Sequence, residues 1–457
     1  MEWWIIQCIR TLIRHPREGG DPQLTSMNCA FLGPRFRGDD GGAAETMRHT
    51  DDQTIASLAA GFGTPLWVYD AATIKSRIAA LRRFDTIRFA QKACSNTHIL
   101  RLMREEGVKV DAVSAGEITR ALHAGYRAGT EDAEIVFTAD VIDRATLELV
   151  AGHGIPVNAG SIDMLEQLGV RSPGHAVWLR INPGFGHGHS QKTNTGGEQS
   201  KHGIWHSDLP QALAAIARHK LKLVGIHMHI GSGVDYSHLS NVCDAMVGLV
   251  ADMGHDIEAI SAGGGLSIPY RAGDAQVDTA HYFSLWDAAR KRIEARLGHA
   301  VHLEIEPGRY LVAESGCLVS EVRAVKDMGG NHFALVDAGF NELMRPALYG
   351  SYHEISLIPP AGSASARATR DTVVAGPLCE SGDVFTQEDG GIVTRRALPD
   401  PRLGDLLVFH DTGAYGASMS SNYNSRPLIA EALVENGAGR LIRRRQTIGE
   451  LLALEEL

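Results

Sequence analysis

Short hydrophobic runs alternate with amphipathic stretches along the middle of the chain. The strand-like runs occupy residues 86–93, 108–115, 134–140, 155–161, 176–183, 223–232, 259–267 and 301–309. Between them, apolar residues recur at intervals of three and four, as in 99–107, 117–126, 145–154, 163–169, 209–220 and 242–254. Eight successive strand–helix units predict an α/β fold of the (β/α)₈ TIM-barrel type. An open doubly wound sheet is the alternative, but no GxGxxG sequence follows the first strand.

The pattern changes after residue 314. Short strand-like pieces, separated by Gly, Pro and Asp turns, lie at 317–328, 331–339, 370–379, 405–415 and 439–447. They predict a mainly β C-terminal domain, resembling a β-barrel or sandwich, over 314–457, and leave 71–313 for the barrel. The segment 47–70 is assigned to the same β-domain, because "TPLWVYD" at 64–70 can supply it with a further strand.

The first 46 residues differ in kind from the rest. "RHPREGGDPQ" and "GPRFRGDDGG" are rich in Gly, Pro and charge and show neither helix nor strand periodicity. They resemble a translated intergenic repeat. We therefore expect a disordered or non-native extension, with Met47 as the native start.

Composition and charge narrow the class of protein. The chain has 457 residues, 44% hydrophobic and 21% charged, which is typical of a globular protein with a large core. A formal charge of −10 argues against nucleic acid or an anionic membrane as the main partner, and no apolar run is long enough to span a bilayer. The six cysteines contain no CxxC pair, which favours a reducing, cytoplasmic location over a zinc or disulfide framework.

In a barrel, function gathers at the carboxyl ends of the strands. Lys92 ends the first predicted strand, where an ammonium has no obvious water, and Asp111 lies on the second. Asn182 ends the fifth, "GGG" at 263–265 ends the seventh, and Glu306 ends the eighth. Taken alone, Lys92 could reach the rim or pair with a carboxylate. Its place in this set favours a chemical role.

Two histidines, His227 and His229, lie two apart in "HMHIGSG" and so face the same side of a strand. They could bind a metal, as in barrel hydrolases, or stack on a flat cofactor, or be ordinary core residues. The glycine run could approach an anion closely or form a plain tight turn. Glu306 and Arg309 could bind a ligand or pair with each other. Cys379 in "GPLCESGD" could be a buried structural thiol.

Seven motifs together resemble one family. "FAQKACSN", "HMHIGSG", "GGGLS", "EPGRYLV", "RPALYGSYHEI", "GPLCESGDVF" and "GAYGASMSSNYNSRP" occur in the order found in the pyridoxal-phosphate decarboxylases built on a barrel and a β-domain. The resemblance runs from about residue 50 to the C-terminus, and it is strongest to the diaminopimelate decarboxylases, with ornithine and arginine decarboxylases as relatives. No metal is expected.

The resemblance implies roles for the matching residues. Lys92 would hold pyridoxal 5'-phosphate as a Schiff base, His229 would stack on its ring, and Glu306 would keep the pyridine nitrogen protonated. Asp111 would support this part of the site, and Cys379 would return a proton to the substrate. The remaining cofactor contacts would come from Ser232, Gly264, Gly265, Gly308, Arg309 and Tyr415.

The substrate implied is diaminopimelate, which would lose CO₂ to give L-lysine in the last step of lysine biosynthesis. Arg309 and Arg345 have the fork geometry that matches its far carboxylate. Tyr349, Glu380 and Tyr415 would supply further polar contacts. An ornithine- or arginine-type relative would need acids for a cationic tail instead. The family also implies a homodimer in which the Cys379 loop reaches the partner's site.

Two other interpretations stay open at this point. A metal-dependent barrel hydrolase would use His227 and His229 but leave the glycine run and Cys379 without roles. A cofactor-handling barrel without catalysis would not need the β-domain. The long connection 183–205 predicts a lid over the barrel mouth. A metal site at its His187 and His189 lacks a nearby acid or thiol.

Overall fold

The structure is a computed structural model, which describes residues 50–129, 132–186, 195–229, 231, 235–363 and 367–456. The chain divides into two units, residues 1–46 and residues 47–457, and every described residue lies in the second. Ser232, His187, His189 and the predicted N-terminal extension are therefore outside the described residues.

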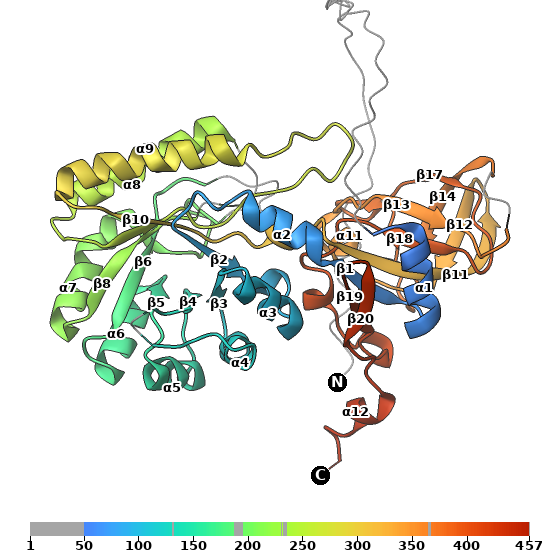
Figure 1. The fold of residues 1–457 in the computed structure, drawn as a ribbon, viewed down its shortest axis with the longest axis horizontal. Coiled ribbons are helices and arrows are strands. Elements are labelled where there is room, and N and C mark those ends of the chain that lie inside the picture. The colour runs from blue at the N-terminus through green and yellow to red at the C-terminus, as the bar shows by residue number, and fades with distance from the viewer. Residues whose placement is uncertain are drawn as a thin grey trace, which may run out of the picture. The chain divides into compact units, whose positions relative to one another are not determined.

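Within the described part of the chain, eight parallel strands form a closed barrel (Figure 1). Its strands are β2 (Thr86–Ala90), β3 (Lys109–Ala112), β4 (Ile135–Ala139), β5 (Val157–Ala159), β6 (Ala176–Asn182), β8 (Lys222–His227), β9 (Ala259–Ser261) and β10 (His302–Ile305). Each barrel strand pairs with the next one along the chain, β10 pairs with β2, and a short β7 (Ile204–Trp205) pairs in parallel with the end of β6. All eight predicted strands are confirmed.

The helices of the barrel region are α2 (Ala71–Ala79) before the first strand, α10 (Arg309–Val312) after the last, and between the strands α3 (Thr97–Glu105), α4 (Ala115–His123), α5 (Arg144–His153), α6 (Ile162–Arg171), α7 (Leu209–His219), α8 (Tyr236–Asp252) and α9 (Thr279–Leu297). Several begin at a side chain that accepts a backbone N–H, such as Ser114 from Glu117 and Asp143 from Thr146. Gly154 and Gly298 end α5 and α9 in the left-handed conformation that favours glycine. The helices thus start and stop where local chemistry dictates, which returns each connection to the same end of the barrel.

The second region is built on a nine-stranded sheet. Its strands are β1 (Leu66–Asp70), β11 (Gly316–Met328), β12 (Asn331–Val336), β13 (Ile355–Ile358), β14 (Thr369–Ala375), β17 (Arg396–Pro399), β18 (Leu406–Phe409), β19 (Ala430–Glu435) and β20 (Ala438–Arg443). A two-stranded sheet of β15 (Gln387–Glu388) and β16 (Ile392–Val393) and the helices α1 (Asp52–Phe62), α11 (Arg345–Tyr349) and α12 (Ile448–Leu452) complete it. As predicted, the strand before the barrel joins this sheet: β1 lies between β11 and β19.

The barrel and the β-domain share one hydrophobic core. Trp67 and Tyr69 of β1 belong to the same buried cluster as Phe89 of β2 and Phe409 of β18. Burying such aromatic side chains is worth roughly 1.5–3 kcal/mol each, so the two regions are held firmly together. None of the described helices is long and apolar enough to cross a membrane.

Candidate active site

A cavity of about 800 Å³ opens at the carboxyl ends of the barrel strands. Pockets that bind small molecules measure roughly 300–1,000 Å³, so this one has room for a cofactor and an amino acid together. The predicted site residues that line it are Lys92, Asp111, His229, Gly264, Gly265, Glu306, Gly308, Arg309, Arg345, Tyr349 and Tyr415.

Lys92 lies in a single 3₁₀ turn, Gln91–Ala93, directly after β2. Its side chain is exposed and lines the cavity, so the expectation that its ammonium lacks water was wrong. The carbonyl of Ala93 accepts the backbone N–H of Tyr415 at 2.8 Å and the Ser418 hydroxyl at 3.1 Å. The β-domain therefore fixes the turn that carries the lysine. Tyr415 makes this contact with a left-handed backbone (φ 60°), a conformation that costs free energy for a residue other than glycine.

Glu306 follows β10 and is buried at the base of the cavity. Its Oε2 lies 2.7 Å from Nε2 of His227, and its Oε1 accepts the Ser261 hydroxyl at 3.4 Å. Burial acts to raise the pKa of Glu306, but His227, Arg88 and Arg180 outweigh it and hold the pKa below its ordinary value. Glu306 is thus an ionised acceptor.

Asp111 behaves in the opposite way. Burial, together with the charge of Glu306, raises the pKa of its carboxyl well above the ordinary value, and the charge of Lys92 only partly opposes this. Its Oδ1 is buried and has no partner among the described residues. Two neighbouring carboxyl groups therefore differ in protonation, Asp111 neutral and Glu306 charged.

His229 is partly buried, and its Nδ1 accepts the backbone N–H of Gly264 at 2.9 Å. Burial, followed by the charges of Arg180 and Lys92, lowers the pKa of His229 well below its usual value, so the ring is neutral. The two histidines of "HMHIGSG" thus have different partners, Glu306 for His227 and the glycine run for His229. Over the described residues, no three His, Cys, Asp or Glu side chains gather as a metal site.

The glycine run owes its shape to missing side chains. A Cβ on Gly264 would lie 2.5 Å from the carbonyl oxygen of Glu306, and one on Gly265 (φ 101°) would lie 2.2 Å from that of Gly231. A Cβ on Gly308, on the turn before α10, would lie 3.2 Å from the carbonyl oxygen of Ala90. Only glycine lets these turns pack so closely against the neighbouring backbone.

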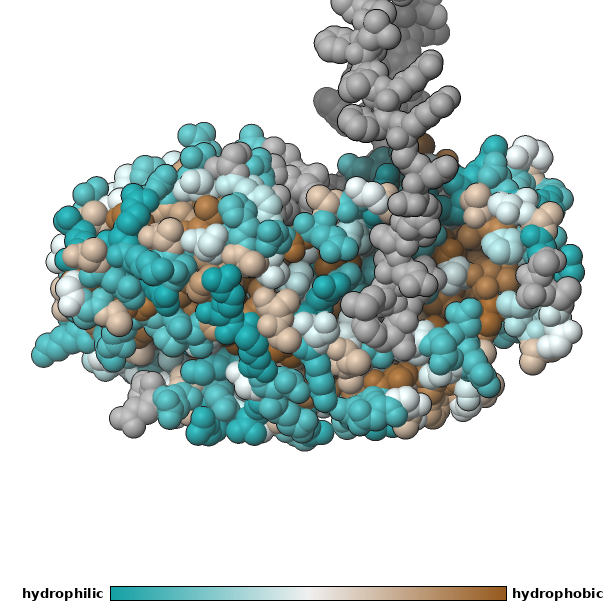
Figure 2. Space-filling view, turned by 45° about the horizontal axis from the view of Figure 1, so that its top comes forward, coloured by the Kyte–Doolittle hydropathy of each residue, from teal (hydrophilic) through white to brown (hydrophobic). Residues whose placement is uncertain are grey.

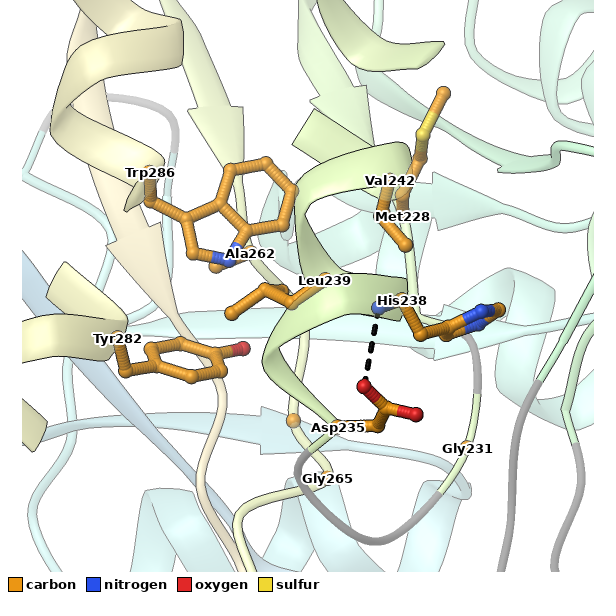
Figure 3. Close-up of a pocket in the computed structure, with 11 residues that line it drawn as sticks. Met228, Gly231, Asp235, His238, Leu239, Val242, Ala262, Gly265, Tyr282 and Trp286 are labelled. Carbon is orange, nitrogen blue, oxygen red and sulfur yellow. Dashed lines mark hydrogen bonds between the residues drawn. The ribbon is translucent and has the colours of Figure 1, made fainter. Parts of the chain in front are cut away.

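Behind the glycine run lies a second cavity, shown in Figure 3. It measures about 30 Å³, enough for a water molecule or two but not for a larger ligand. Trp286 and Tyr282 of α9 form one wall, and on the other side the His238 N–H, in the first turn of α8, donates to the Asp235 carboxylate at 3.2 Å. The side chains around this small space lie next to the glycine run, and the space itself is not a candidate site.

Arg309 and Arg345 meet at a single phenol. Nη1 of Arg309 and Nη1 of Arg345 donate to the Tyr270 hydroxyl oxygen at 3.0 and 3.2 Å. Arg345 is 5% exposed and also donates to Nε2 of His353 at 3.1 Å. We call these four residues the arginine cluster. Within the described residues neither guanidinium has a carboxylate within 4 Å, so two cations are held by neutral groups alone.

Among the cavity residues that the sequence analysis did not predict are Arg180, Tyr270, His202 and Asp140. Arg180 is a buried cation inside the barrel, and a lone basic residue in the apolar run "AVWLRINP" was a signal for it. His202 Nδ1 contacts the Asp140 carboxylate at 2.5 Å, and Thr195 donates its hydroxyl to the His229 carbonyl at 3.1 Å. The described end of the 183–205 connection is therefore fixed beside the cavity; the lid itself stays a prediction.

Cys379 and Glu380 are both exposed, and neither lines the cavity. The Cys379 backbone N–H donates to Oδ1 of Asn424 at 2.9 Å, which fixes the loop on the surface of the β-domain. The fold does not bring these two predicted residues to the other site residues of the same chain.

The residues present fit pyridoxal phosphate. The unpartnered Oδ1 of Asp111 and Nδ1 of His227 are buried polar atoms beside the cavity, which favours polar groups of a ligand there. The glycine turns offer backbone donors suited to a phosphate, Glu306 is an ionised acceptor suited to a protonated ring nitrogen, and Lys92 is an amine open to the cavity.

Comparison with known proteins agrees with this chemistry. The family described as pyridoxal-dependent decarboxylase, pyridoxal binding domain, matches residues 71–313. The fold and the site together therefore define a pyridoxal-dependent decarboxylase.

Individual relatives narrow the class. The diaminopimelate decarboxylase of Escherichia coli is 68% identical over 406 residues, 89% of this chain and 97% of that protein. That of Streptomyces coelicolor is 66% identical over 405 residues, covering 89% and 92%. A crystal structure of diaminopimelate decarboxylase, 66% identical, superposes with a TM-score of 0.88 over 92% of this chain and 100% of that one. The chain belongs to the diaminopimelate decarboxylase family.

Proposed function

We propose that this protein decarboxylates meso-diaminopimelate to L-lysine and CO₂, the last step of lysine biosynthesis, with pyridoxal phosphate as cofactor. The observation that carries the proposal is that one cavity contains both an accessible lysine and two guanidiniums that have no carboxylate partner among the described residues. Diaminopimelate has two amino-acid ends, so it presents one end for reaction and a second carboxylate for the arginines. The names of the relatives agree with this substrate.

When bound, the cofactor supplies an electron sink for the pair left behind as CO₂ departs. Lys92 would hold it covalently and give way to the substrate amine. Glu306, ionised and buried, would accept a hydrogen bond from the protonated ring nitrogen. Neutral His229 would lie against the face of the ring. Asp111, holding its proton, would support this part of the site without adding a second negative charge.

The phosphate would bind at the turns that contain Gly264, Gly265 and Gly308, where the Gly264 N–H is bonded to His229 and the backbone N–H groups of Gly265 and Gly308 would be the donors. Ser232 and Tyr415 would add hydroxyl donors, the first from just outside the described residues. Because these donors are mostly backbone groups fixed by close glycine packing, they would position the phosphate without side-chain reorganisation.

The far carboxylate would bind to Arg309 and Arg345, with the Tyr349 hydroxyl close by. Guanidinium forks pair with carboxylates through parallel hydrogen bonds, which gives orientation as well as affinity. A substrate with a cationic tail, such as ornithine, would bring a third positive charge to this cluster. The ornithine-type alternative is therefore disfavoured on charge alone.

We also propose a homodimer in which Cys379 and Glu380 serve the partner's site. Two observations support it: both residues are exposed and away from the cavity of their own chain, and most exposed large hydrophobic residues belong to the β-domain. Figure 2 shows hydrophobic side chains, in brown, gathered on that part of the visible face. Tyr423, stacked on Phe340 with ring centres 5.5 Å apart, is exposed beside the Asn424 that binds Cys379.

The four described cysteines are free thiols, which supports a cytoplasmic location.

The cofactor assignment has a direct test. The purified protein should be yellow, and borohydride should remove the visible band and fix the cofactor to the peptide that contains Lys92. A colourless preparation that contains zinc would instead support the hydrolase interpretation.

Subunit mixing tests the shared site. Lys92→Ala and Cys379→Ala homodimers should each be inactive for different missing parts. Random exchange makes half of the dimers mixed, and each mixed dimer has one intact site, so activity should return to roughly a quarter of native. No recovery despite demonstrated exchange would place Cys379 in its own chain's reaction.

A further inference from the structure

The phenol of Tyr270 joins three segments that are far apart in the sequence. Tyr270 lies in the connection after β9, Arg309 begins α10, and Arg345 begins α11 of the β-domain. Their side chains meet at the Tyr270 oxygen, with Arg309 at 3.0 Å and Arg345 at 3.2 Å. The Arg345 guanidinium also lies 5.0 Å from the centre of the Tyr270 ring, so both the oxygen and the ring contact the cation.

The direction of the hydrogen bonds at this oxygen follows from chemistry. A guanidinium can only donate, so the Tyr270 oxygen accepts from both arginines and uses both of its lone pairs. Its own hydrogen then points in a third direction. Because Tyr270, Arg309 and Arg345 all line the cavity, three donors converge on one region of it.

His353 is the second hydrogen-bond partner of Arg345. Its Nδ1 lies 2.9 Å from the carbonyl of His410, which can only accept, so Nδ1 carries the proton and Nε2 is the bare acceptor for Arg345. Burial and the charge of Arg345 lower the pKa of His353 well below its ordinary value, in keeping with a neutral ring. Arg345 is therefore held between two neutral acceptors, and no carboxylate of the described part of the chain pairs with its charge.

We propose that Tyr270 is a specificity-determining residue: its phenol holds Arg309 and Arg345 side by side, and its O–H is the third donor to the far carboxylate of the substrate. This inference rests on the proposed function and adds to the predicted substrate contacts a residue that none of them includes. It assigns to Tyr270 the selection of substrates with a second carboxylate, and no part in the bond-breaking step.

Tyr270→Phe keeps the ring and removes only the oxygen, so it tests this role in the cofactor-loaded full chain. KM for meso-diaminopimelate should rise about tenfold or more while kcat stays within about twofold, because the lost contact is present before and during reaction. Tyr126→Phe is the matched control: its buried hydroxyl donates to the Leu100 carbonyl at 3.0 Å and does not line the cavity. That variant should leave both constants unchanged.

Binding of two inhibitors gives a readout that does not depend on turnover. L-Lysine keeps the carboxylate that was far from the reaction, and cadaverine lacks it. Tyr270→Phe should weaken L-lysine about tenfold and leave cadaverine unchanged. Equal weakening of both, or of neither, would overturn the inference while leaving the proposed function intact. A native protein that releases no CO₂ from diaminopimelate would overturn the proposed function itself.

A second pair of variants tests the same cluster without altering Tyr270. His353→Leu removes an acceptor of Arg345 and should weaken L-lysine selectively. His353→Gln can donate to the His410 carbonyl and still accept from Arg345, so it should restore most of the affinity. If leucine and glutamine act alike, or cadaverine is affected as strongly as L-lysine, Arg345 is not positioned as proposed.

Discussion

Two clusters that line one cavity differ in how their charges are balanced. In the lysine cluster (Lys92, Asp111, Arg180, His227 and Glu306), negative charge meets positive charge, and Asp111 avoids an excess by keeping its proton. In the arginine cluster, Arg309 and Arg345 share a phenol, and Arg345 also meets a neutral imidazole, without any carboxylate among the described residues.

The difference follows from what each cluster has to bind. A cofactor that carries both a basic ring nitrogen and an acidic phosphate suits surroundings already balanced in charge. A cation without a negative partner costs free energy in the protein interior, and binding of an anion beside it offsets that cost. The arginine cluster therefore belongs to the substrate, and the lysine cluster to the cofactor.

The largest effect is expected from removing Lys92, and a variant without it that stays active would contradict the role of the lysine cluster. Lys92→Ala should lower kcat/KM by roughly 10³-fold or more and abolish the visible band, because the variant loses the amine that would hold the cofactor. Lys222→Ala is the control, since this lysine is exposed at the start of β8 and its partner Glu258 is exposed as well. Activity near native in Lys92→Ala would contradict the assignment.

Arg345→Ala tests the other cluster. Losing a charge-assisted pair should cost about 2–3 kcal/mol, or roughly a 30- to 150-fold rise in KM for diaminopimelate, with a smaller change in kcat. The exposed Arg323→Ala should behave as native. A fall in kcat with KM unchanged would mean that Arg345 serves the reacting centre instead of the far carboxylate.

Glu342, in the β-domain, shows how a buried acid responds when no ion pair is present for it among the described residues. It accepts the Gly339 N–H at 2.7 Å and a bond from the Asn341 amide, and burial raises its pKa to about 7. The folded state thus binds this proton more tightly than the unfolded state, whose pKa is near the ordinary 4.5. The resulting stability is present below about pH 4.5 and is lost as pH rises through about 7.

Glu342→Gln should remove this dependence. Between pH 5 and pH 8 the native protein should lose on the order of 2 kcal/mol of unfolding free energy relative to the variant, measured by urea denaturation at both values. A difference that stays constant across this range would show that Glu342 titrates normally. Unlike an arginine, this acid can escape an uncompensated charge by taking up a proton.

Much of this architecture can be predicted from the sequence because it repeats. Eight strand–helix units have one topology that closes, and Lys92, Asp111, His229 and Glu306 fall at strand ends that the barrel must bring together. The parallel pairing of β1 with β19 was not predicted, because a strand's partner depends on contacts distant in sequence.

Tyr270 and His353 escaped prediction for a similar reason. Neither residue stands out in its own segment. The role of each side chain depends on the fold of the barrel and the β-domain, which places it beside an arginine. The exposure of Lys92 could not be predicted either, because it depends on a turn after β2 that a strand-like pattern does not reveal. Local chemistry thus predicts the cofactor residues better than it predicts those that choose the substrate.

The central claim is that one cavity joins a cofactor lysine to an arginine cluster that selects a second carboxylate. Its most direct test compares kcat/KM of the native, cofactor-loaded protein for meso-diaminopimelate, L-lysine and L-ornithine. Because buried donors left unpaired reject a substrate strongly, CO₂ release from diaminopimelate should exceed that from the other two by roughly 10⁴-fold. Comparable turnover of all three would contradict the claim.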